Sequence, residues 1–152
     1  MREEAGAAAV RVLQAALAAE HAVIWGYGVV GAHLSGGALR RARAAEATHR
    51  ARRNSVRLTL RARGANPVPA AATYRLPFAV DGPGSALRLA VHLEAGDADA
   101  WDAVLTATAA EAALRREALT ALTDAAVRAA HWRLLAARSG PATVTFPGRP
   151  TR

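Results

Sequence analysis

The connections between its helical stretches constrain the fold of this chain more than any other sequence feature. Alanine supplies most of the apolar half of the chain, and β-branched residues are few, so the sequence favours helix. Residues 64–84 interrupt this pattern with four prolines, which predicts an extended segment. The other connections between the helical stretches are short. We therefore expect helices over residues 4–34, 38–63, 85–108 and 111–138, with a tail over residues 139–152.

The lengths of these connections predict the topology. Short turns make the first and second helices antiparallel neighbours, and likewise the third and fourth. About twenty extended residues reach roughly 60 Å, whereas a 26-residue helix such as the predicted second one is only about 39 Å long. The crossover 64–84 can therefore return along the bundle and start the third helix parallel to the second, with Ser85 as its N-cap. The prediction is a single all-α domain over residues 1–152, a four-helix bundle with the ferritin-like arrangement.

Composition narrows the classes of function. All 20 basic residues are arginine, against 12 acidic residues, so the formal net charge is +8. The absence of cysteine excludes disulfides, thiolate catalysis and zinc–thiolate sites. The first residues lack the pattern of a signal peptide, and the apolar stretch around Ala22–Leu34 is too short to span a bilayer. We expect a cytoplasmic protein with no membrane contact.

Two carboxylates interrupt the predicted core faces. Glu20 and Glu94 each stand where an apolar residue should lie, in lines that alternate steps of four and three. A buried carboxylate needs a metal, a cation or a proton as partner. The two lines are Leu13, Leu17, Glu20, Ile24, Tyr27, Gly31 and Leu34, and Leu87, Val91, Glu94, Ala98, Trp101 and Leu105.

Fragments in a fixed order over nearly the whole chain carry a resemblance to a known family. They are Ala19-Glu20-His21-Ala22 with Tyr27-Gly28, then His49-Arg50-x-Arg52-Arg53, Pro67 with Leu76-Pro77, Leu93-Glu94, and Ala125-Ala126-Val127-Arg128-Ala129. The chain resembles an uncharacterised, alanine-rich ferritin-like family of high-GC bacteria. The resemblance implies a ferritin-like fold and no established function.

Ferritin-like di-iron proteins take a glutamate from two helices and a Glu-x-x-His pair from each of the other two. The candidate metal ligands in this chain are Glu20, Glu46, His49 and Glu94. The fourth stretch offers no second Glu-x-x-His pair. Its Leu119 and Leu122 are assigned to the apolar face, and its polar face holds Glu117, Asp124, Arg128 and His131.

Three interpretations of this cluster follow. A metal-free polar network is preferred, with Arg53 neutralising Glu20 or Glu94. One divalent ion, or a working centre of two iron or manganese ions, remains the alternative. We expect no catalytic residue and no cofactor, and a binding or structural role. The alternative function is a metal-dependent oxidoreductase or an iron-handling protein.

Nine arginines between Arg40 and Arg63 form rows that flank the apolar face of the second helix. Such rows contact phosphates in nucleic-acid binders, but they also solvate the flanks of a bundle helix. No recognition helix or stacking aromatics accompany them, so nucleic-acid binding is a second alternative that we do not expect.

The first helix carries a further apolar line away from Glu20, through Ala18, Ala22, Trp25 and Val29. A helix that is apolar on two sides is buried on two sides. We expect a homodimer through this line, although contact with the crossover would also cover it. Gly26, Gly28 and Gly31 indicate close helix packing.

Overall fold

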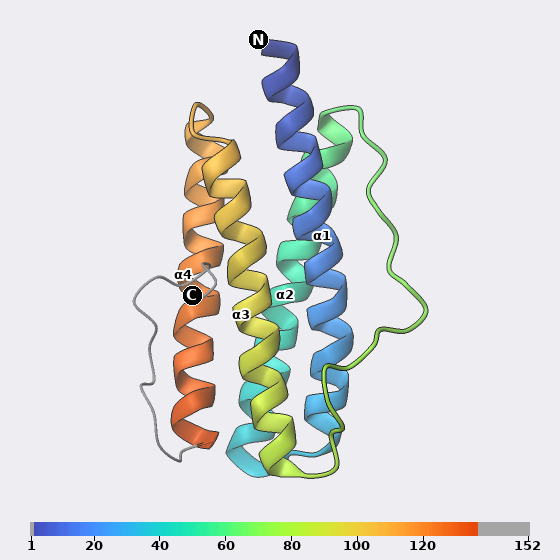
Figure 1. Cartoon of the computed structure of the whole chain (residues 1–152), viewed down its shortest axis with the longest axis vertical. Coiled ribbons are helices and arrows are strands. Elements are labelled where there is room, and N and C mark those ends of the chain that lie inside the picture. Colours follow the sequence, from blue (N-terminus) through green and yellow to red (C-terminus); the bar gives the residue numbers. More distant parts are fainter. Residues whose placement is uncertain (1, 137–152) are drawn as a thin grey trace.

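The computed structural model describes residues 2–136 (Figure 1). Within them lie four helices, α1 (Arg2–Ala32), α2 (Gly36–Ala62), α3 (Pro83–Ala107) and α4 (Ala112–Ala136). The predicted all-α four-helix bundle is confirmed, and the helix bounds differ from the predicted ones by one or two residues. The tail 139–152 and the last two residues of the predicted fourth helix lie outside the described residues.

A left-handed glycine ends α2, and capping residues and a proline determine where α3 begins. Gly64 adopts φ +74°, the left-handed conformation that ends a helix at low cost for glycine. The prediction that Ser85 is the N-cap of α3 was wrong: Gly82 takes that position. Ser85 lies in the first turn, and its Oγ accepts the backbone N–H of Gly82 at 3.1 Å. Pro83 is tolerated at the start of the helix because N–H groups in the first turn have no acceptor within the helix.

The long connection passes along the outside of α1 from one end of the bundle to the other (Figure 1). As a result α2 and α3 run in the same direction, as predicted from the connection lengths. Helix α1 packs against both α2 and α3, and α3 packs against α4. Side chains also link α2 to α4: Arg52 donates to Asp124 at 2.9 Å, and Ser55 donates to Glu117 at 2.9 Å.

Two apolar clusters form the core. One includes Leu13, Leu17, Val56, Leu60, Trp101 and Val104. The other includes Val23, Tyr27, Val30, Leu89, Ala90 and Trp132.

Helix α4 contributes mainly small residues to this core. Its buried residues are Leu114, Ala118, Ala121, Ala125, Ala129 and Trp132. The assignment of Leu119 to the apolar face was wrong, since 53% of Leu119 is exposed. In an alanine-rich helix the large apolar residues do not mark the buried face, because close approach of the backbones favours alanine there.

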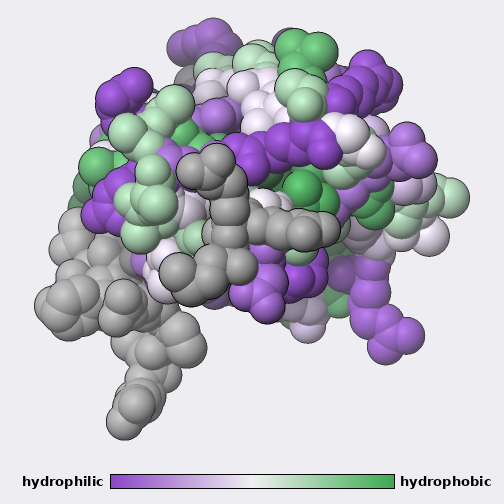
Figure 2. Space-filling model, turned by 90° about the horizontal axis from the view of Figure 1, so that it is seen from above, coloured by the Kyte–Doolittle hydropathy of each residue, from purple (hydrophilic) through white to green (hydrophobic). Residues whose placement is uncertain are grey.

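By length and composition, the Gly6–Ala32 part of α1 could cross a membrane, contrary to the prediction from the shorter stretch around Ala22–Leu34. In the bundle this part of α1 carries the buried side chains of Glu20 and His21. The central helix of a bundle meets the same criterion, because it too is apolar over most of its length. Over the end of the bundle seen in Figure 2, hydrophilic and hydrophobic side chains are interspersed.

Candidate functional site

A layer of polar side chains separates the two apolar clusters. Glu20 of α1, His49 of α2, and Glu94 and Asp97 of α3 are all completely buried. Along each helix they lie between residues of one cluster and residues of the other. The candidate site is therefore in the middle of the bundle and is formed by side chains of different helices.

His49 is at the centre of this layer. Its Nδ1 lies 2.8 Å from Oε2 of Glu20 and 3.9 Å from Oδ2 of Asp97. On the other side of the ring, Nε2 lies 3.3 Å from Oε1 of Glu94. The second oxygen of Glu20 accepts the indole N–H of Trp101 at 3.0 Å. One imidazole thus contacts carboxylates of two other helices.

Glu94 joins this layer to α4. Its Oε1 accepts a hydrogen bond from Nε of Arg128 at 2.8 Å and another from the hydroxyl of Tyr27. Trp132 donates in turn to the Tyr27 oxygen at 2.8 Å. Arg128 is 18% exposed, so its guanidinium reaches the buried layer from the edge of the bundle.

Burial and neighbouring charges set the protonation of the layer. Burial by itself lowers the pKa of His49, but hydrogen bonds to Glu20 and Glu94 outweigh it and raise the pKa to about 9. Burial also raises the pKa of Glu94, yet His49 and Arg128 leave it below its usual value. For Asp97, burial and the nearby Glu20 charge raise the pKa well above the usual value. His49 is therefore cationic, and the carboxyl group of Asp97 holds a proton more readily than an ordinary aspartate does.

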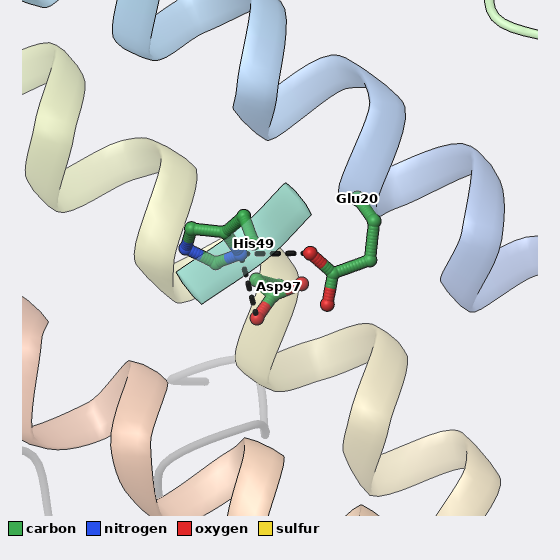
Figure 3. A group of neighbouring side chains, drawn as sticks. All are labelled: Glu20, His49 and Asp97. Carbon is green, nitrogen blue, oxygen red and sulfur yellow. Dashed lines mark hydrogen bonds and ion pairs between the residues drawn. The ribbon is translucent and has the colours of Figure 1, made fainter. Parts of the chain in front are cut away.

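Asp97 is the least satisfied group of the site. Both of its carboxylate oxygens, and Oε2 of Glu94, are buried without a hydrogen-bond partner among the described residues. In Figure 3 the carboxylates of Glu20 and Asp97 face the same nitrogen of His49. Because an unsatisfied buried polar group costs about 1–3 kcal/mol, this arrangement calls for a ligand or a proton.

The four predicted ligands do not all converge. Glu20, His49 and Glu94 meet in the core, but Glu46 is only partly buried and its Oε1 accepts a hydrogen bond from Nε of Arg50 at 2.9 Å. The prediction that Glu46 points into the core was therefore wrong. Residues three apart on a helix share a face only approximately, and here His49 takes the buried direction while Glu46 lies at the flank.

The predicted role of Arg53 was also wrong. Its guanidinium donates to the side chain of its neighbour Asn54, at 3.0 and 3.1 Å, and the described residues give it no ion pair with Glu20 or Glu94. Arg128 of α4 neutralises Glu94 instead. An arginine was expected to neutralise Glu94, but this arginine comes from α4 and not from α2.

Two residues of the site were missed at the sequence level. Asp97 follows Glu94 by three residues, which is the spacing used to pair Glu46 with His49, so the signal was available. Arg128 lies between the buried Ala125 and Ala129 and was assigned to the polar face. Its position one turn before the buried Trp132 was the only signal that its side chain borders the core.

Two surface pockets lie beside the helices that carry the layer. One of about 210 Å³ lies between α2 and α4, and Arg41, Thr48, Arg128, His131 and Trp132 are part of its lining. The other, of about 640 Å³, lies between α1, α2 and the crossover. There Trp25 packs against Tyr74 of the crossover, with ring centroids 5.8 Å apart.

Fold and site together define an all-α four-helix bundle with a buried ionic layer. The chain belongs to the family described as Domain of unknown function (DUF4439), which matches residues 12–151. It is similar to the crystal structure of a conserved hypothetical protein from Mycobacterium tuberculosis, with 43% sequence identity and a TM-score of 0.82. The similarity covers 86% of this chain and 98% of that chain. Comparison with curated proteins gives no match.

Proposed function

We propose that this protein is a ferritin-like domain without a working di-iron centre, which acts as a binding or structural module. The observation that carries the proposal is the contact between Arg128 and Glu94, with Nε 2.8 Å from Oε1. In a di-iron bundle the fourth helix would supply ligands at this level. Here it supplies a permanent positive charge.

The residues present do not fit a two-metal centre. Such a centre needs a Glu-x-x-His pair from two helices. Glu46 is turned to the flank and paired with Arg50. A second ion beside Glu94 would also lie against the guanidinium of Arg128, and two cations at that distance repel strongly in a buried site.

The alternative function, a metal-dependent oxidoreductase or iron-handling protein, would use the ligands that remain in the core. Nucleic-acid binding has weaker support, because several arginines of α2 already have carboxylate partners. Arg50 pairs with Glu46, Arg52 with Asp124, and Arg63 with Glu111. These pairs reduce the charge that α2 offers to phosphates.

Metal content and reaction with oxygen together test the proposal. The protein would be purified without chelators, its iron and manganese measured per chain, and oxygen consumption followed after addition of ferrous iron. We expect at most one transition-metal ion per chain, and ferrous oxidation no faster than in buffer alone. Two iron ions per chain with rapid oxygen consumption would overturn the proposal.

A further inference from the structure

Glu20, His49 and Asp97 place three potential metal-ligand atoms together. One carboxylate oxygen from each acid and a ring nitrogen of His49 all lie within 4.8 Å of one another. For ion–ligand bonds of about 2.1 Å, neighbouring ligand atoms lie roughly 3.0–3.4 Å apart. The distances of 2.8 Å and 3.9 Å from Nδ1 of His49 to the two carboxylates lie on either side of this range. Small side-chain movements would bring both distances into this range.

We propose that Glu20, Asp97 and Nδ1 of His49 bind one divalent first-row transition-metal ion, which displaces to solvent the proton that Nδ1 carries in the metal-free protein. The inference deepens the proposed function, on which it rests, by naming the ligand of the same site. The independent observation is Asp97, which is fully buried and is directed at the other two ligands in Figure 3, and neither of its oxygens has a hydrogen bond from residues 2–136.

The chemistry of the ligands selects the class of ion. One imidazole nitrogen and two carboxylate oxygens suit manganese, ferrous iron or zinc better than magnesium or calcium, which prefer oxygen ligands alone. The indole N–H of Trp101 donates a hydrogen bond to Oε1 of Glu20 at 3.0 Å, so the other oxygen, Oε2, is the one that would bind the ion. The other ring nitrogen of His49 lies 3.3 Å from Glu94, which would fix the orientation of the imidazole, as is usual for metal-bound histidine.

Arg128 limits this site to one ion and also separates the layer from a surface pocket. Its guanidinium takes the Glu94 side of the layer, so the ion is confined to the side of Glu20 and Asp97. The same side chain lines the 210 Å³ pocket between α2 and α4. The guanidinium of Arg128 therefore lies between that pocket and the Glu94 side of the buried layer.

The test uses Mn²⁺ as the probe, because protein-bound Mn²⁺ loses the sharp paramagnetic resonance signal of the free ion. The full chain is treated with chelator, dialysed, incubated with Mn²⁺ for several hours and titrated. We expect about one bound ion per chain for the wild type and at least a tenfold higher dissociation constant for Asp97→Asn. The matched control is Asp99→Asn, an exposed position on the same helix, which should bind as the wild type does.

Helix content and thermal unfolding without metal check that Asp97→Asn folds. If it does not fold, Glu20→Gln takes its place with the same expectation. No binding by the wild type, or equal affinity in wild type and the folded variant, would overturn the site and leave the proposed function standing. Two Mn²⁺ ions per chain would overturn the site and the proposed function together.

Discussion

Arg128 is the residue on which the charge balance of the core depends. Without it, the partners of Glu94 Oε1 among the described residues would be only the hydroxyl of Tyr27 and the longer contact with His49. Removing one partner of a buried ion pair typically costs about 3–5 kcal/mol. We expect Arg128→Met to lower the free energy of unfolding by about that amount, measured by urea denaturation.

Arg53→Met is the matched comparison, because within the described part of the chain Arg53 donates only to its neighbour Asn54. Its effect should stay within about 0.5 kcal/mol. Equal losses in the two variants would show that Arg128 contributes nothing specific to Glu94.

His49 gives the stability of the bundle a dependence on alkaline pH. Its pKa is about 9 in the folded protein, against about 6.5 in the unfolded chain. A raised pKa means that the native state binds the proton more tightly. The stabilisation is complete below pH 6.5 and is lost as pH rises to about 9, a change on the order of 3 kcal/mol.

Melting temperature measured in metal-free buffer should therefore fall for the wild type across the pH range from about 6.5 to about 9. The His49→Gln variant should be less stable at pH 6.5 but nearly flat over the same range. Parallel curves for the two proteins would assign the pH dependence to other groups.

At the scale of single residues, periodicity predicted part of the site. Glu20 and Glu94 were found because each replaces an apolar residue in a regular line, and His49 was found because it forms a Glu-x-x-His pair with Glu46. Asp97 was missed because the buried face of α3 is wider than one line of fours and threes. Arg128 was missed because periodicity gives the direction of Cβ, whereas a long side chain reaches the core from the edge of the face.

At the scale of the helices, substitution by alanine is expected to have opposite effects at two glycines of α1. A Cβ on Gly26 would lie 2.7 Å from both terminal carbons of Leu93 on α3. A Cβ on Gly28 would meet nothing within 4 Å. Only Gly26 thus requires the close packing expected for this group of glycines, while Gly31 would make an ordinary contact with Leu39.

Alanine is preferred over glycine inside a helix by about 1 kcal/mol, so Gly28→Ala should raise the free energy of unfolding by about that much. Gly26→Ala gains the same preference but forces Leu93 to move. It should be less stable than Gly28→Ala by about 1–3 kcal/mol, measured by urea denaturation. Equal stability of the two variants would show that Leu93 moves at no cost.

The helices themselves were predictable, because proline, glycine and long alanine-rich stretches act locally. Their ends were predicted only to within one or two residues, since capping depends on backbone geometry that composition does not specify. The buried face of α4 could not be predicted from its leucines. Leu119 is exposed, and the packed positions are alanines that look the same as their surface neighbours in sequence.

At the scale of the whole molecule, the length of the crossover predicted the parallel arrangement of α2 and α3, because only an extended segment can return along the bundle. The same segment bears on assembly. Tyr74 covers part of Trp25, while Ala18 is exposed and Ala22 and Val29 are half-buried. The predicted dimer face is thus covered only in part within one chain.

A second copy would complete that burial through a two-fold contact between α1 helices, in which each residue meets the same surface of its partner. The small side chains of Ala18 and Ala22 would allow close approach, and Trp25 would be the large anchor typical of an interface. We expect the wild type to sediment as a dimer and Trp25→Glu as a monomer, because a buried carboxylate without a partner opposes association. A Tyr74→Ala variant separates the two ways of covering Trp25, and it should remain dimeric if the second copy provides the main contact. If the wild type and Trp25→Glu both sediment as monomers, and only the variant is less stable, then the crossover alone covers this face.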